Sequence, residues 1–353
     1  MESIIGRIKE LSEDIGRPLN LMEVCGTHTV AIFRHGIRSV IPDKIRLLSG
    51  PGCPVCVTSV ADVEKAIRIS EEKGVILTTF GDMMRVPGVK RTLTDARVEG
   101  ADVRIVYSPV DALTLAKDNS DKTVVFFATG FETTSPSVAA TLLMAEGEGV
   151  KNFYIHSVHK LVPPALNALV SMEGIDIDGF ILPGHVSTII GVVPYRFLCN
   201  DHNIASVIAG FGAEDILKGI QLLMEQISRD QYDVKVQYSD VVREEGNPKA
   251  MQILTDLFKE EDAHWRGIGV IPGSGLVLRK EYEHRDALKL FDIDIADAGE
   301  PKACRCGDVL TGRILPTQCN LFGKVCTPEK PVGACMVSTE GSCAAYYKYG
   351  GTE

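Results

Sequence analysis

Ten cysteines constrain this chain of 353 residues most strongly, because nearly all of them lie in two stretches toward its ends. No apolar leader and no run of 18 apolar residues is present, so we expect a cytoplasmic protein without a membrane segment. Thiols stay reduced in that compartment, where cysteine-rich patterns indicate metal or redox chemistry more often than disulfides. The cysteines are Cys25, Cys53, Cys56, Cys199, Cys304, Cys306, Cys319, Cys326, Cys335 and Cys343.

The C-terminal segment that begins at Pro301 has little regular periodicity and is dominated by Gly, Pro and Cys. A segment with so few aliphatic residues needs another source of order, and a bound metal centre provides one. Structural zinc usually shows two close CxxC pairs, which this segment lacks. Iron–sulfur clusters accept irregular spacing, because the cube presents its iron corners in different directions. We therefore favour an iron–sulfur cluster, with zinc as the alternative.

Four of the six C-terminal cysteines suffice for one cluster. Cys304 and Cys306 are two residues apart, and one cluster rarely takes both thiols from so short a span. We select the ligands Cys304, Cys319, Cys326 and Cys343. Cys306 and Cys335 then remain as a spare pair, which we interpret as a redox pair beside the cluster. The alternative is two inert packing thiols.

A second thiol group lies near the N-terminus, in EVCGTHT and GPGCPVC. The sequence GPGCPVC lies between a predicted strand and a predicted helix, where backbone N–H groups and the helix dipole favour thiolate. One interpretation is a thioredoxin-like redox pair of Cys53 and Cys56. The other is a metal site in which Cys25 joins them and three thiolates hold one iron, leaving positions open for soft ligands such as cyanide or carbon monoxide. Structural packing is the remaining alternative.

The middle of the chain alternates short apolar runs with amphipathic stretches such as 59–72, 137–146 and 213–228. This alternation predicts an α/β fold with parallel sheets. A weak internal repeat suggests two similar α/β domains, 46–120 and 121–240, whose strand ends face a cleft. The predicted strands are 45–48, 75–77, 103–106, 124–127, 153–155, 180–182 and 205–208.

Polar residues in the loops of the predicted cleft are further candidates. His28 follows Cys25 by three residues and is placed to ligate metal or relay a proton, and His185 lies in LPGHVST. Glu132, in TGFETTSP, is a candidate acid or base. For all three, a purely local structural role is the alternative. Cys199 is expected to be a small buried residue.

The charge balance and the missing motifs narrow the function. The net charge of −10 and an aromatic content of 6% argue against nucleic acid as the main partner. Neither a P-loop nor a G-x-S-x-G elbow occurs.

The combined motifs resemble the [NiFe]-hydrogenase maturation protein family HypD over nearly the whole chain. The matching segments are EVCGTHT, IFRHGIRS, GPGCPVC, TFGDMMRVPG, ATGFETTSP, LPGHVS and the C-terminal segment from Cys304 to Gly350. The resemblance implies a cofactor-assembly scaffold, not an enzyme, that builds the Fe(CN)2CO unit with a small HypC-type chaperone and receives cyanide from a HypE-type protein.

The resemblance also implies site residues and a third domain. Cys25, Cys53 and Cys56 would form the iron and chaperone site, and a [4Fe-4S] cluster would sit on the four selected C-terminal cysteines. An iron–sulfur domain would be built from both chain ends, 1–45 and 241–353. The runner-up function is a standalone thiol–disulfide oxidoreductase with an iron–sulfur relay, and a third is a zinc-stabilised binding module.

Overall fold

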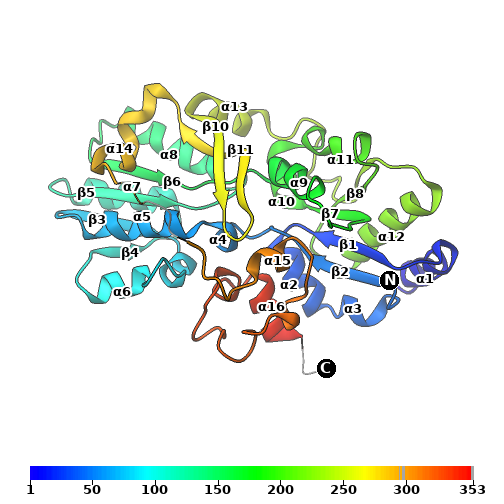
Figure 1. Cartoon of the computed structure of the whole chain (residues 1–353). Helices are drawn as coiled ribbons and strands as arrows, with labels where there is room; N and C mark the ends of the chain where they lie inside the picture. Colours follow the sequence, from blue (N-terminus) through cyan, green and yellow to red (C-terminus); the bar gives the residue numbers. More distant parts are fainter. Residues whose placement is uncertain (294, 296–298, 351–353) are drawn as a thin grey trace.

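Two α/β lobes flank a central hairpin and the C-terminal segment in the computed structural model (Figure 1). The structure describes residues 1–293, 295 and 299–350. No helix within this described part combines the length and the apolar character needed to cross a membrane.

The first lobe is built on a five-stranded parallel sheet. Leu21, Ile181 and Val207 are buried in it, as expected for a parallel sheet with both faces covered. Helices α1 (Glu2–Ile15) and α12 (Ala213–Arg229) cover one face, and α9, α10 and α11 pack on the other side. The strands, in spatial order, are β2 (Ile45–Ser49), β1 (Leu19–Glu23), β7 (Gly179–Pro183), β8 (Ala205–Ala209) and β9 (Val234–Val236). These three helices are α9 (Val162–Val170), α10 (Gly184–Ile190) and α11 (Phe197–Asn200).

The second lobe is built on a four-stranded parallel sheet. Its strands, in spatial order, are β4 (Val103–Ile105), β3 (Val75–Thr79), β5 (Thr123–Ala128) and β6 (Phe153–Ser157). Helices α5 and α6 pack on one face and α7 and α8 on the other. Their bounds are α5 (Val60–Glu71), α6 (Leu93–Val98), α7 (Pro109–Asp118) and α8 (Ser135–Gly147). The α/β class predicted from the sequence is confirmed, and each predicted strand is found.

The sheets do not follow the predicted domain boundaries. β5 pairs with β3, so a boundary between residues 120 and 121 cuts through one sheet. β2 pairs with β1 and belongs with β7 and β8, so the second lobe is an insertion between the two halves of the first. The predicted units 46–120 and 121–240 are therefore wrong. Strand–helix alternation identifies the elements, but it does not say which strands lie side by side.

A long antiparallel hairpin lies between the lobes (Figure 1). It consists of β10 (Phe258–Trp265) and β11 (Gly269–Leu278). Helix α13 (Pro248–Leu257) precedes it, and the two strands of the hairpin were not predicted. β10 alternates poorly because most of its middle residues are exposed. Trp265, which is buried at the end of β10, bridges to Thr58.

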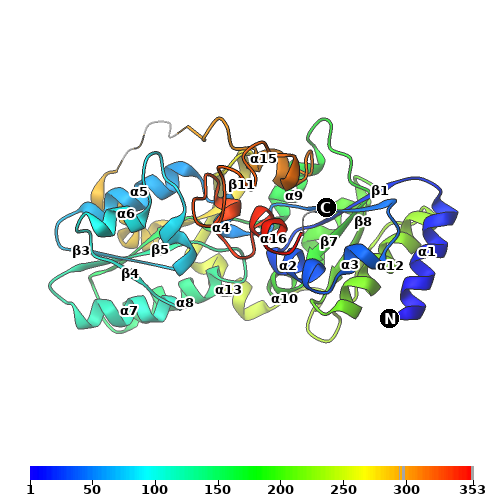
Figure 2. The same ribbon diagram turned by 90° about the horizontal axis from the view of Figure 1, so that it is seen from below.

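The C-terminal segment, residues 299–350, has only short elements and runs beneath the hairpin (Figure 2). Its last helix, α16, lies against α2 (Gly26–Arg34), where the rings of Phe33 and Tyr346 are 4.7 Å apart. The C-terminal segment is therefore in contact with the N-terminal helix α2. The short elements of this segment are α15 (Cys306–Leu310), η4 (Pro316–Gln318), η5 (Ala334–Met336) and α16 (Ser342–Tyr349). Other short elements that lie elsewhere in the chain include α3 (Ile37–Val40), η2 (Val193–Tyr195), η3 (Lys280–Arg285) and α14 (Ala287–Phe291).

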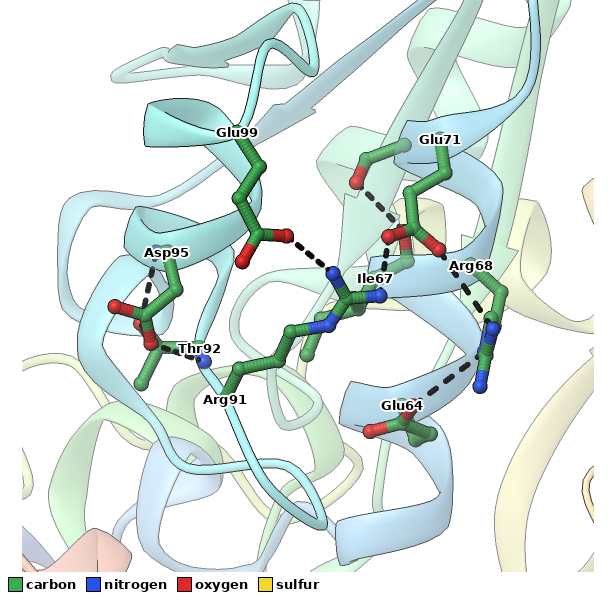
Figure 3. Close-up of polar contacts among 9 residues, drawn as sticks. Glu64, Ile67, Arg68, Glu71, Arg91, Thr92, Asp95 and Glu99 are labelled. Atoms are coloured by element: carbon green, nitrogen blue, oxygen red, sulfur yellow. Dashed lines mark hydrogen bonds and ion pairs between the residues drawn. The ribbon is translucent and has the colours of Figure 1, made fainter.

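A network of charges fixes the loop that follows the 3-10 helix η1 (Gly81–Arg85), as Figure 3 shows. Arg91 pairs with Glu71 of α5 and, at 2.5 Å, with Glu99. Glu64 accepts a hydrogen bond from the backbone N–H of Val89 at 3.2 Å. Exposed ion pairs each contribute little, but together these contacts hold the loop 86–92 against α5.

Two buried histidines lie at the end of β6. His156 donates from Nε2 to the carbonyl of Asp62 at 3.2 Å and stacks on Phe127, and burial lowers its pKa to about 4. Burial likewise lowers the pKa of His159 to about 3. Both rings are therefore neutral at physiological pH.

Acid is expected to destabilise the protein through these histidines. The unfolded chain takes up a proton near pH 6.5, above the folded pKa of about 4 for His156, so its contribution is complete above pH 6.5 and is lost as the pH falls toward 4. The expected loss for His156 alone is roughly 2 kcal/mol between pH 7 and pH 5. Urea unfolding at several pH values measures it. His156→Gln should flatten this slope, and an unchanged slope would contradict the assignment.

Candidate metal centre

Two neighbouring strand ends carry the N-terminal thiols. β1 and β2 are parallel neighbours that end at Glu23 and Ser49, so the loops after them emerge at one edge of the sheet. Cys25 directly precedes α2, and Cys53 directly precedes the short helix α4 (Pro54–Val57). Cys53 and Cys56 are both buried, and the Cys53 sulfur accepts a hydrogen bond from the Cys56 backbone N–H at 3.4 Å.

Gly52 allows the two loops to approach closely. The N–H of Gly26 donates to the carbonyl of Gly52 at 3.0 Å. A Cβ at Gly52 would lie 2.2 Å from the backbone nitrogen of Cys25, so any other residue would separate the loops. The Gly/Pro frame of GPGCPVC thus holds Cys53 beside the segment that contains Cys25.

Two acidic residues near Cys25 were not predicted. Glu23 is buried. Its carboxylate accepts hydrogen bonds from the Thr29 hydroxyl at 2.6 Å and from the backbone N–H of Cys25 at 3.4 Å. Burial raises its pKa to about 8. Glu340, from the C-terminal segment, accepts a hydrogen bond from the Thr27 hydroxyl at 2.8 Å. Glu23 lies inside the motif EVCGTHT, so the motif could have indicated a role at the site. No sequence motif indicated that Glu340 would lie there.

The six C-terminal cysteines line a single narrow cavity: Cys304, Cys306, Cys319, Cys326, Cys335 and Cys343. The pKa of the Cys343 thiol lies well above its usual value, first through burial and then through the nearby thiols of the other three selected ligands and Cys306. Within the described residues, no three Cys, His, Asp or Glu side chains converge on one point that would hold a single metal ion. A cube needs no such convergence, because it spreads its ligands over four iron corners.

Hydrogen bonds link five thiols into one row, which we call the thiol chain: Cys304, Cys306, Cys335, Cys56 and Cys53. Cys306 and Cys335, the predicted redox pair, are direct neighbours in it. They lie between Cys304 of the selected cluster ligands and Cys56 of the predicted iron site. The thiol chain therefore connects the two cysteine groups that the sequence places about 250 residues apart.

The Cys56, Cys306 and Cys335 thiols are neutral as placed. Burial is the largest cause that raises the pKa of Cys56 well above its usual value. Cys25 is partly exposed as a residue, yet desolvation of its thiol raises its pKa to about 11. The predicted preference for thiolate at the helix start is therefore wrong for Cys56. Helix α4 has four residues, and its weak dipole does not offset burial.

The predicted histidines flank a phenylalanine rather than the thiol chain. The buried His28 donates from Nε2 to the carbonyl of Gly210 at 2.9 Å, and burial lowers its pKa to about 4. Its backbone N–H, not its ring, contacts the Cys25 thiol. The exposed His185 stacks on Phe211, with ring centres 4.2 Å apart, and His28 stacks on the same ring at 4.6 Å.

Glu132 is buried between α9 and the hairpin. It accepts the backbone N–H of Val162 at 2.8 Å, its second oxygen has no partner within the described structure, and burial raises its pKa to about 7. It lines a different cavity from the one that the C-terminal cysteines line. Cys199 is buried in the first lobe and donates to the carbonyl of Ile204 at 3.3 Å, as expected of a packing residue.

The second lobe also reaches the C-terminal segment. Asp82 accepts a hydrogen bond from Ser338 at 2.8 Å, and Arg85 donates to the carbonyls of Pro328 and Val337. The motif TFGDMMRVPG thus contacts the segment that contains Cys335.

Comparison with known proteins identifies the family to which the chain belongs. The family described as "HypD: Hydrogenase formation hypA family" matches residues 1–350. The chain is 44% identical to the hydrogenase maturation factor HypD of Rhodobacter capsulatus, over 99% of this chain and 95% of that protein. It is 44% identical to HypD of Escherichia coli strain K12, over 99% and 94%, and 43% identical to HypD of Azotobacter vinelandii, over 96% and 91%. With a match of this extent, the chain belongs to the HypD family of hydrogenase maturation factors.

Proposed function

We propose that this maturation factor is a scaffold and electron source for assembly of the Fe(CN)2CO unit of [NiFe]-hydrogenase. The thiol chain is the observation that carries the proposal. It places a dithiol between a set of cysteines suited to a cluster and a set suited to a single iron. Electron supply and iron binding are thereby joined inside one chain.

The selected cysteines fit a [4Fe-4S] cluster by their chemistry. All four are soft sulfur donors around one cavity whose remaining wall includes Leu321 and Phe322. When bound, such a cluster supplies electrons singly. Short elements surround the cavity, so the metal centre would also order this segment.

Iron is the cargo of the second site. Cys25, Cys53 and Cys56 would hold it after a rearrangement that brings their three thiols to one point, because thiolates bind iron well and three ligands leave positions open for cyanide and carbon monoxide. The raised pKa values of Cys25 and Cys56 mean that iron binding must release protons from these thiols, so iron loading is expected to be favoured by higher pH. The partial exposure of Cys25 supports an iron site that a partner protein can reach.

The dithiol provides the electron pair for cyanide transfer. Cleavage of the S–C bond in a thiocyanate takes up two electrons and yields cyanide and a thiolate. Oxidation of Cys306 and Cys335 to a disulfide supplies these two electrons and releases two protons. The departing thiolate takes one proton and solvent takes the other, and cyanide passes to the iron.

Partners follow from the same proposal. A HypC-type chaperone would cover the iron site and a HypE-type protein would donate cyanide during hydrogenase maturation. The chain itself acts as a scaffold without turnover of a free substrate. Burial of the dithiol favours this function over a standalone thiol–disulfide oxidoreductase, because Cys306 and Cys335 are only 5% and 1% exposed and a disulfide substrate needs an accessible thiol.

Infrared spectroscopy tests the proposal. The full chain is purified without oxygen in complex with a HypC-type chaperone and supplied with a HypE-type cyanide donor. We expect absorption bands for iron-bound cyanide and carbon monoxide. A protein that contains zinc without iron or sulfide, and shows no such bands, would support the zinc-stabilised binding module instead.

A further inference from the structure

A buried arginine lies at the turn of the central hairpin. Arg266 follows β10 directly and is 1% exposed. Its Nε donates to the carbonyl of Thr58 at 2.8 Å and Nη2 donates to the carbonyl of Pro87 at 2.7 Å. Nη1 is buried and has no partner within the described residues. The guanidinium therefore spans the loop after the CxxC pair and the loop of TFGDMMRVPG.

The charge of Arg266 is not balanced by a carboxylate in the part of the chain that the structure describes. Two other buried cations show the usual arrangement: Lys160 pairs with Asp62 at 3.4 Å, and Arg285 pairs with Glu146 at 2.6 Å. An isolated buried charge is strongly unfavourable unless an anion lies nearby. Arg266 thus calls for a counter-charge that protein oxygens do not provide here.

Cysteine sulfur close to Arg266 is a candidate for that anion. A Cβ at Gly267 would lie 3.1 Å from the Cys306 sulfur, and a Cβ at Gly307 would lie 1.9 Å from the Gly267 carbonyl oxygen. The backbones at 266–267 and 306–307 are therefore in direct contact. The positive charge of Arg266 also acts to lower the pKa of both Cys304 and Cys306.

We propose that Arg266 is the buried counter-charge of the iron–sulfur cluster in the C-terminal segment and that it raises the reduction potential of this cluster. The inference rests on the proposed function. Four cysteinates around a [4Fe-4S] core of charge 2+ give a net charge of −2, and one added electron gives −3. A fixed cation in a poorly solvated site stabilises the more negative, reduced state. Arg266 is a positioning residue in this sense, since it acts on the potential of a group that other residues hold.

Redox titration of the full chain, purified without oxygen and followed by electron paramagnetic resonance, tests this role. At a fixed applied potential, Arg266→Gln is expected to lower the ratio of reduced to oxidised cluster at least tenfold, which is about 59 mV for a one-electron couple. Arg266→Lys keeps the charge and should retain most of the wild-type potential.

Two control variants test whether the shift in potential comes from the buried charge. One removes an arginine that is next to the cluster ligands in sequence, and the other removes a buried arginine elsewhere that stabilises the fold. Arg305 stands between Cys304 and Cys306 in sequence, but it is exposed and paired with Asp308 at 2.8 Å, so Arg305→Gln should shift the ratio less than threefold. Arg285 is a buried arginine that also bonds two carbonyls. Arg285→Gln should lower the thermal midpoint without moving the potential.

The outcomes distinguish this inference from the proposed function. Wild-type protein without iron and sulfide would overturn the proposed function. Wild-type protein with a cluster, and Arg266→Gln with the wild-type potential, would overturn the role of Arg266 alone. If Arg266→Gln does not fold, the Arg305→Gln variant is labelled with 15N-arginine and studied by pulsed electron paramagnetic resonance. A 15N coupling to the reduced cluster supports the inference, and the absence of this coupling overturns it.

Discussion

Replacement of Cys56 by alanine is expected to abolish assembly of the iron fragment while the cluster in the C-terminal segment stays intact. Cys56 is fully buried and contacts both Cys53 and Cys335, so its removal takes away an iron ligand and interrupts the thiol chain. The cyanide and carbon monoxide bands of the complex with the chaperone should disappear. The visible absorbance and the sulfide content of the chain should remain those of the wild type.

Cys199→Ala is the matched control for this variant. Cys199 is also a buried cysteine, but it bonds the carbonyl of Ile204 in the first lobe and takes no part in the thiol chain. This substitution should leave the infrared bands unchanged. If the bands survive in Cys56→Ala, the assignment of the iron site is wrong. If the cluster absorbance is lost in Cys56→Ala, the two sites are not separate.

Replacement of Cys343 by serine is expected to eliminate the cluster and to release the C-terminal segment. Cys343 lies at the start of α16, and its thiol interacts with those of Cys304, Cys319 and Cys326. The segment has little aliphatic core of its own, so loss of the centre should expose it. Iron and sulfide content should fall to background, and limited proteolysis should cut within 299–350 far faster than in the wild type.

Tyr347→Phe provides the control in the same helix, because Tyr347 is exposed on α16 and does not line the cavity, and the substitution keeps its ring beside Phe322. It should keep the cluster and the proteolytic resistance. Chelation of the metal from wild-type protein should reproduce the behaviour of Cys343→Ser. A segment that stays resistant after chelation would show that packing, not metal, orders it.

The elements of the fold were predictable, whereas their pairing was not. Runs such as Val124–Phe127 are short, apolar and bounded by turns, which identifies a buried strand locally. The pairing of β1 with β7 joins residues 158 positions apart, such as Leu21 and Gly179, and one sequence holds no pattern for such a contact. β1 itself was missed, because the cysteine motif that follows it drew residues 1–45 into the predicted cluster domain.

At the site, too, the sequence identified candidate residues but not the contacts between distant segments. The selection of four cluster ligands left Cys306 and Cys335 as a pair, and their side chains are neighbours in the structure. Spacing did not predict that Cys335 contacts Cys56, or that Glu340 lies beside Cys25, because these contacts join segments far apart in the chain. No sequence motif marks Arg266 as a functional residue. It differs from other arginines only in being buried without a carboxylate partner, which the structure alone reveals.

Mössbauer spectroscopy of 57Fe-labelled protein shows whether the two cysteine groups hold iron for different purposes. In the anaerobic complex with the chaperone, we expect two iron populations, one typical of a cluster and one of a single low-spin iron. Cys343→Ser should remove the first population, and Cys56→Ala should remove the second. A single iron population that disappears in both variants would show that the two cysteine groups do not hold separate iron centres.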